Sequence, residues 1–276
     1  MQDVQNHKDT RCTPIDEVGV SHVTFPFSFP LKDGIPGTFY KTVATIAMGV
    51  SLPHDRKGTH MSRFVEELNK HDTFHPGLFK EFLTMLCSRL DASTSFISVS
   101  FPFFLKKAAP VSKKEGLLDY QCGFRACFEA TGKHYNELVE VKVPVTSLCP
   151  CSKEISVVGA HNQRSEISIQ VIPSESYHQT IWLEDLIDVA ESSSSCPVYS
   201  VLKREDEKYV TEWAFNHPCF VEDSTRSVSL QLSEMQASGA LDWFRVICTN
   251  FESIHNHNAY ARIEKGKNQP QLHLMF

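Results

Sequence analysis

Two thiols and an imidazole lie within thirteen residues near the middle of the chain. Cys149 and Cys151 precede His161, and the cations Lys153 and Arg164 are interleaved with them. Thiolate and imidazole hold zinc and similar divalent ions, and neighbouring cations lower a thiol pKa and can meet an anionic substrate. A structural zinc knuckle would need a second close cysteine pair, and the sequence has no Cys-x-x-Cys. The stretch therefore predicts an active or metal-binding site, with structural cysteines as the alternative.

Polar residues gather at three further places in the second half of the chain. Glu207 lies in a mixed-charge run, residues 204–209, of the kind that usually forms a solvated helix face. Glu222 stands near the start of a predicted helix, where acids complement the helix dipole. His255 and His257 can face one ligand on an extended strand, whereas on a helix they would diverge. The residues alone favour the structural explanation for both glutamates and leave the histidine pair open.

Basic residues also open the first predicted helix. Lys57 and Arg63 are two of three cations there, and His60 lies between them. A helix N-terminus with such cations is a candidate phosphate-binding site. Thr59 or Ser62 could equally be no more than the helix cap.

The hydrophobic pattern predicts two similar modules that would position these residues. We expect an N-terminal arm over residues 1–36 and one catalytic unit over 37–276, made of modules at about 37–146 and 147–276. Strands, a helix pair and more strands are typical of an α+β protein whose helices cover one face of antiparallel sheets. Strands are expected at 38–52, 94–105, 117–130, 137–145, 164–172 and 243–251, and helices at 61–68, 79–90, 183–190 and 218–235.

Composition excludes several classes of protein. Of 276 residues, 41% are hydrophobic and 22% charged, which is ordinary for a soluble globular protein. No apolar run approaches the roughly 18 residues that cross a bilayer, and the N-terminus has no apolar signal core, so we expect a cytoplasmic protein without a membrane partner. Nine cysteines without framework spacing argue against a disulfide scaffold. A net charge of −6 argues against a nucleic-acid partner.

Taken together, these clusters resemble one family, the type IB GTP cyclohydrolases. The Cys-Pro-Cys-Ser-Lys and Glu-Ser-Ile-His-Asn-His blocks are specific, and the matches follow the expected order from about residue 30 to 265. One departure is Val157-Val158, where an aromatic residue is expected before the glycine. The matching stretches are 52–55, 57–64, 147–156, 159–165, 196–199, 203–211, 220–223 and 251–261.

The resemblance implies a fold, an assembly and a set of site residues. The fold would be the tunnelling fold, in which two modules of antiparallel sheet with paired helices join across subunits into a barrel. Members of the family are homotetramers with active sites at subunit interfaces. By the family pattern, the metal ligands are Cys149, His161, Glu207 and His255, and Glu222 anchors the purine edge. Candidates for delivering a proton to the purine are His60 and His257, and candidates for holding the triphosphate are Lys57, Arg63, Lys153 and Arg164.

The implied reaction opens the imidazole ring of GTP at C8, releases formate and gives 7,8-dihydroneopterin triphosphate. The metal could be zinc, manganese or iron, and the product could serve folate or queuosine synthesis. One alternative is a nitrile reductase of the same fold with a cysteine nucleophile and NADPH. Its cysteine is followed by a Thr-containing, Pro-Asp motif, whereas Cys149 is followed by Pro-Cys-Ser-Lys-Glu. A second alternative is a non-catalytic, zinc-stabilised interaction module.

Overall fold

The computed structural model describes residues 5, 8–35 and 38–266. These residues form two compact units. The first contains the chain up to residue 101 together with 123–138, and the second contains 102–122 together with 139–266. The modules predicted from the sequence, 37–146 and 147–276, are a separate proposal that this division does not test.

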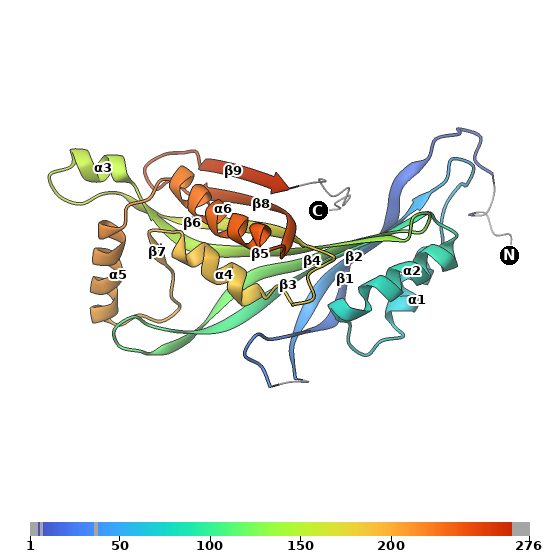
Figure 1. Ribbon diagram of the computed structural model, residues 1–276, viewed down its shortest axis with the longest axis horizontal. Helices are drawn as coiled ribbons and strands as arrows, with labels where there is room; N and C mark the ends of the chain where they lie inside the picture. The colour runs from blue at the N-terminus through green and yellow to red at the C-terminus, as the bar shows by residue number, and fades with distance from the viewer. Residues whose placement is uncertain (1–4, 6–7, 36–37, 267–276) are drawn as a thin grey trace. The chain divides into compact units, whose positions relative to one another are not determined.

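The first unit is an antiparallel sheet with two helices packed against it (Figure 1). Neighbouring strands pair in the order β1, β2, β3, and the register places Phe27 opposite Thr42 and Met48 opposite Ile97. The helices α1 and α2 contact each other, and α1 also contacts β1 while α2 contacts β2. Its elements are β1 (Ile15–Pro30), β2 (Phe39–Leu52), α1 (Met61–Leu68), η2 (Pro76–Leu78), α2 (Phe79–Leu90) and parts of β3 (Thr94–Ala108), β4 (Glu115–Glu129) and β5 (His134–Leu148).

Buried phenylalanines form the core of the first unit. The ring centroids of Phe27 and Phe101 are 5.0 Å apart, and Phe101 stacks on Phe124 at 5.7 Å. Phe27 lies on β1, within the segment 1–36 that the sequence analysis assigns to an N-terminal arm, so residues 15–30 belong to the sheet. The strand forms because Phe25, Phe27 and Phe29 alternate toward the core, and β1 is an edge strand, which tolerates its prolines.

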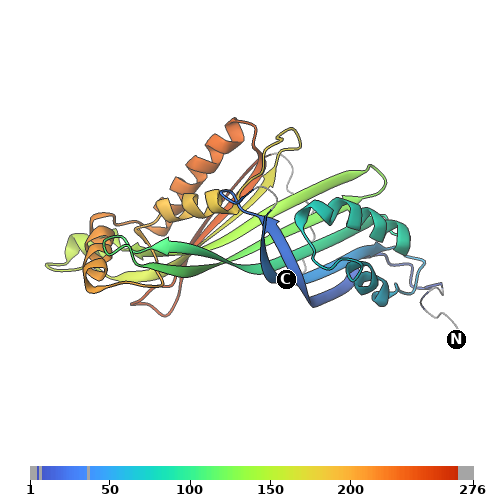
Figure 2. The ribbon, with the colours of Figure 1, turned by 90° about the horizontal axis from the view of Figure 1, so that it is seen from below.

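The second unit carries four helices on its own antiparallel strands. β5 pairs with β6, β6 with β8, and β8 with β9, while β7 adds two residues beside β5. The amphipathic helices α4 and α6 pack on one face of this sheet (Figure 2). Besides parts of β3, β4 and β5, its elements are α3 (Pro150–Ile155), β6 (Asn162–Pro173), α4 (Leu183–Ser192), β7 (Cys196–Pro197), α5 (Arg204–Asn216), α6 (Val221–Ala237), β8 (Leu241–Asn250) and β9 (Ala259–Gly266).

Alternation on β6 and β8 separates an apolar face from a polar one. Ile167, Ile169 and Val171 on β6 are buried and share one face of the strand, because they are two positions apart. The opposite face carries hydrogen-bonded polar groups, because the Gln170 amide donates to Glu140 and accepts from Arg245. The C-terminal end of β5 and the N-terminal end of β6 lie side by side, and they lead directly to Cys149 and His161.

Every strand and helix predicted from the sequence has a counterpart, and six elements were not predicted. These are β1, the short η2 and α3, the two-residue β7, α5 and the edge strand β9. All nine cysteines are free thiols. Among helices of the described residues, none is both long and apolar enough to cross a bilayer.

Candidate active site

Cys149 and His161 lie opposite each other where the β5–β6 ladder ends. The last pair of the ladder joins Leu148 to Asn162, and the backbone N–H of Cys149 then donates to the carbonyl of His161 at 3.1 Å. Ser152 closes the same corner, because its hydroxyl donates to the Cys149 carbonyl at 3.2 Å and accepts from the His161 N–H at 3.1 Å. Two of the predicted metal ligands are therefore held together by backbone geometry.

The Cys149 thiol is half-buried at the N-cap of α3. Its Sγ accepts a hydrogen bond from the Ser152 N–H at 3.5 Å, while Pro150 begins the helix. Cys151, one residue into α3, is exposed instead. The structure thus distinguishes the two thiols: the first faces the corner that contains His161, and the second faces solvent.

The imidazole of His161 is oriented by two side chains. Its Nδ1 lies 2.9 Å from Oε1 of Gln163 and 4.0 Å from a carboxylate oxygen of Glu252. The Gln163 side chain is 6% exposed, so this contact is inside the protein. Glu252 belongs to the loop after β8, whose first residue, Phe251, donates its N–H to the Arg164 carbonyl at 3.0 Å. The loop that carries the predicted histidines is thereby fastened to β6.

Helix α5 presents Glu207 on an exposed first turn that Asp206 fixes to the β3–β4 hairpin. Asp206 is 0% exposed and accepts from the backbone N–H groups of Val111 at 2.8 Å, Ser112 at 2.9 Å and Lys203 at 2.8 Å. The Ser112 hydroxyl donates to it at 2.6 Å. Burial raises the pKa of Asp206, but these hydrogen bonds outweigh burial and hold the pKa well below its usual range. The mixed-charge run 204–209 is therefore not only a solvated helix face, because Asp206 is buried and hydrogen-bonded.

The remainder of α5 packs against the corner that holds Cys149. Ala214 lies in a small apolar cluster with Leu148 and Cys196, and Ala160 and Val210 pack against that cluster. Residues 207, 210 and 214 share one helix face, since they are three and seven positions apart. Glu207 therefore projects from the stripe of α5 that contacts the neighbours of Cys149 and His161.

Lys153 contacts the C-terminal turn of α5. Its ammonium donates to the Phe215 carbonyl and lies 4.3 Å from the centroid of the Phe215 ring. Cations near a helix C-terminus stabilise its carbonyl groups. Lys153 was predicted to hold the triphosphate, and in this structure it connects α3 to α5. Arg164, the other predicted cation of this stretch, is exposed on β6.

At the start of α6, the two acids have different surroundings. Asp223 accepts from the Phe220 N–H at 3.1 Å and so caps the helix. Glu222 is exposed on the first turn and is not the cap. The preceding Cys219 donates its backbone N–H to the Leu148 carbonyl at 3.0 Å, which joins the start of α6 to the residue before Cys149. Glu222 therefore belongs to the same end of the second unit as Cys149.

His255 and His257 lie together in the loop between β8 and β9. Their ring centroids are 4.9 Å apart and the rings stack at an interplanar angle of 13°. Both histidines are exposed. The two imidazoles thus share one side of the loop, although residues 253–257 form a bend and not an extended strand.

Three predicted residues belong to the first unit. Lys57 is exposed, and His60 is half-buried at the N-cap of α1, where no side chain caps the helix. The Arg63 guanidinium donates to the Arg89 carbonyl at 3.0 Å. The alternative interpretation, in which Thr59 or Ser62 serves only as the cap of α1, is therefore wrong.

The donor chemistry at Cys149 and His161 suits a divalent metal ion. Thiolate sulfur, imidazole nitrogen and carboxylate oxygen are zinc ligands, and other first-row ions accept the same mixed set. Within residues 5, 8–35 and 38–266, however, no three His, Cys, Asp or Glu side chains are grouped closely enough to hold a metal ion. Two of the four predicted ligands are brought together, and convergence of Glu207 and His255 on them stays a prediction.

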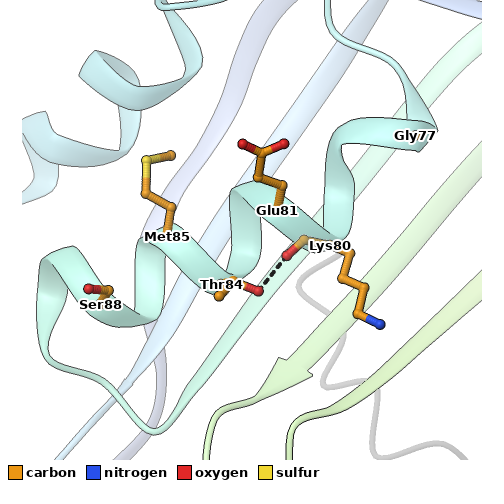
Figure 3. A pocket seen from close by; sticks show the side chains of 6 residues that line it. All are labelled: Gly77, Lys80, Glu81, Thr84, Met85 and Ser88. Atoms are coloured by element: carbon orange, nitrogen blue, oxygen red, sulfur yellow. Dashed lines mark hydrogen bonds between the residues drawn. The ribbon is translucent and has the colours of Figure 1, made fainter.

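A separate depression lies along the outer face of α2 (Figure 3). Only Lys80 and Glu81 among its lining residues are charged, and the Thr84 hydroxyl donates to the Lys80 carbonyl at 2.7 Å. None of the predicted site residues lines it. Its chemistry gives no reason to consider it catalytic.

Comparison with known proteins identifies the family. The family described as "Type I GTP cyclohydrolase folE2" matches residues 1–261. The chain belongs to this family. A GTP cyclohydrolase FolE2 from Geobacter sp. (strain M21) is 46% identical over 268 residues, which cover 97% of this chain and 96% of that protein. A FolE2 from Syntrophotalea carbinolica is 47% identical over 265 residues, covering 96% and 95%.

Solved structures give the fold class of this FolE2 family member. A uricase from Bacillus fastidious matches with a TM-score of 0.54 at 8% identity, covering 91% of this chain and 93% of the uricase. Urate oxidase from Bacillus sp. TB-90 matches with a TM-score of 0.53 at 9% identity, covering 92% and 100%. At such low identity the likeness concerns the fold alone. The predicted α+β tunnelling fold is confirmed.

Three residues at this end of the second unit were not predicted from the FolE2 sequence pattern. Gln163 and Glu252 contact His161, and Asp206 fixes the helix that carries Glu207. Gln163 could have been found, because residues two apart on a strand share a face. Nothing local marks Glu252, since its partner lies far away in the sequence. The contact of Asp206 with Lys203 is local, but its contacts with Val111 and Ser112 are not.

Proposed function

We propose that this protein is a metal-dependent GTP cyclohydrolase that converts GTP to 7,8-dihydroneopterin triphosphate and formate. Membership of the FolE2 family is the observation that carries the proposal. The placement of Cys149 beside His161, at the end of β5 and β6, supports it independently, because it pairs a thiol with an oriented imidazole. Water must add at C8 of the purine, the ring must open, and that carbon must leave as formate.

We propose Cys149, His161, Glu207 and His255 as the residues that hold the metal. When bound, a divalent ion would supply a nucleophile at neutral pH by lowering the pKa of a water molecule beside C8. The protein must supply the remaining chemistry. His60 and His257 are the candidates for delivering a proton to N7, a role that suits an imidazole near neutral pH.

Guanine selection is proposed for Glu222. A carboxylate can accept from the N1–H and the 2-amino group of guanine together, and adenine lacks this pair of donors. Asp223 caps the helix, so the exposed Glu222 is not needed for capping and is available to bind guanine. The candidates for the triphosphate are Lys57, Arg63, Lys153 and Arg164. Lys153 donates to the Phe215 carbonyl and Arg63 to the Arg89 carbonyl, so the exposed Lys57 and Arg164 are the stronger candidates.

We also propose a homotetramer located in the cytoplasm. Four apolar side chains near the site are strongly exposed, namely Ile155 at 83%, Val157 at 100%, Val158 at 86% and Ile254 at 63%. Apolar surface of this kind commonly marks a subunit interface. The nine free thiols support a reducing compartment. Light scattering after size exclusion should give four chains of 31.3 kDa, and a monomer that stays fully active on dilution would contradict the assembly.

The activity is tested by incubating protein loaded with zinc, manganese or iron with GTP and recording pterin fluorescence after oxidation. GTP should yield the fluorophore and ATP should not. A nitrile reductase would instead consume NADPH with a nitrile substrate, and an interaction module would turn over neither. Absence of a pterin with every metal would reject the proposal.

A further inference from the structure

A buried polar network continues from His161 into the second unit. Four of its members are nearly inaccessible: Ser147 is 2% exposed, Gln163 6%, Ser165 4% and Asn250 5%. They come from β5, β6 and β8, so the network crosses three strands at the end of the sheet where Cys149 lies. A buried polar group without a partner costs about 1–3 kcal/mol. The hydrogen-bond directions are therefore strongly constrained.

The direction of the network is fixed at its inner end by a backbone carbonyl. The Ser147 hydroxyl lies 2.8 Å from the Cys219 carbonyl, which can only accept, so the single Ser147 proton points there. Ser147 Oγ must then act as an acceptor toward its other neighbours. These are the amide nitrogen of Asn250 at 3.0 Å and that of Gln163 at 3.5 Å. Ser165 donates to Asn250 Oδ1 at 2.7 Å, which is compatible with the same orientation of that amide.

The Gln163 amide transmits this direction to the imidazole. With its NH2 group toward Ser147, its carbonyl oxygen faces His161 Nδ1 at 2.9 Å. The reversed amide would bring its oxygen against Ser147 Oγ, whose only proton is already donated to Cys219. An amide oxygen cannot donate, so Nδ1 must carry the proton, and the nearby Glu252 carboxylate at 4.0 Å favours the same form.

We propose that Gln163 is a positioning residue that holds neutral His161 in its Nδ1–H tautomer and leaves the Nε2 lone pair for the metal ion. Which imidazole nitrogen binds a metal is set by the hydrogen bond that the other nitrogen makes. Gln163 touches neither substrate nor metal in this role. The inference rests on the proposed function, because it takes His161 to be a metal ligand.

Zinc affinity, measured by competition with a chromophoric chelator, tests the inference. Gln163→Leu should weaken Zn²⁺ binding 10- to 100-fold, the usual effect of losing such a partner. Gln163→Glu keeps an acceptor for Nδ1–H but cannot donate to Ser147, so it should stay within about threefold of the parent or bind more tightly. If Gln163 were needed only to hold Ser147, the glutamate variant would be as defective as the leucine variant.

Gln170→Leu is the matched control, because Gln170 is also a buried glutamine on β6 but contacts Glu140 and Arg245. It should bind Zn²⁺ like the parent. If His161→Ala loses zinc while both Gln163 variants match Gln170→Leu, the inference is wrong and the proposed ligand survives. If His161→Ala binds zinc normally, the proposed ligand set itself fails.

A second measurement records the tautomer in the parent protein, and a variant serves only to assign the signal. In metal-free protein labelled with ¹⁵N-histidine, long-range proton–nitrogen correlations distinguish the two neutral tautomers. The signal that disappears in His161→Asn should show the Nδ1–H pattern. An Nε2–H pattern at that signal would overturn the inference.

Discussion

Asp206 allows a stability prediction that the hydrogen bonds determine in detail. In Asp206→Asn, one oxygen can keep the two backbone N–H groups of Val111 and Ser112, and the Ser112 hydroxyl can turn to accept from the new amide. The Lys203 N–H, at 2.8 Å, would then face another donor. One hydrogen bond to a charged group is lost, which costs about 1.5–3 kcal/mol. Asp206→Ala removes all four contacts and should cost roughly 3–5 kcal/mol.

Urea unfolding at fixed protein concentration is the assay, since an oligomer's apparent stability depends on concentration. Glu205→Gln is the control, because Glu205 is exposed on the same turn of α5 and should change stability by less than about 0.5 kcal/mol. If Asp206→Asn matched that control, Asp206 would not fix the start of α5. The order Ala, Asn, parent, from least to most stable, is the expected result.

Three further predictions concern chemistry. Cys149→Ala should abolish activity and weaken metal binding, while the exposed Cys151 should tolerate alanine. If Cys151→Ala were inactive and Cys149→Ala active, Cys151 would be the metal ligand instead. Glu222→Gln should lower kcat/KM for GTP at least about tenfold with unchanged metal content, because one charge-assisted contact is lost; loss of metal with normal GTP affinity would make Glu222 a ligand. Burial raises the pKa of the Cys248 thiol to about 11. The pKa of this thiol in the unfolded chain is about 8.5. Its contribution to the free energy of unfolding is therefore fully present below that pH and is lost as the pH rises toward 11, by about 1.4 kcal/mol per pH unit. The free energy of unfolding, measured with urea, should therefore fall less steeply between pH 8 and 10.5 for Cys248→Ala than for the parent. Equal slopes against pH would contradict the raised pKa of Cys248.

Local pattern predicted those elements whose folding depends on a continuous apolar face. Helix α2 shows this, since Phe79, Phe82, Leu83 and Leu86 are spaced for burial and are all buried. The missed elements lack that signal. Prolines obscure the alternation of β1, α3 has only six residues, and β9 is an edge strand with few buried side chains.

The same limit applies to the site. Cys149 and His161 were predicted as neighbours because they are close in sequence and resemble a known family. The residues that orient them depend on distant pairing: Asn250 bonds to Ser147 across 103 positions, and Asp206 bonds to Val111 across 95. No periodicity covers such separations, so these contacts follow only from the folded sheet.

The most direct measurement is the release of formate from GTP labelled with ¹⁴C at C8. Metal-loaded protein should release one labelled formate for each pterin formed, and Cys149→Ala or prior removal of metal by a chelator should abolish both products. Label retained in the nucleotide product, or formate released equally well by Cys149→Ala, would contradict metal-assisted ring opening at this site.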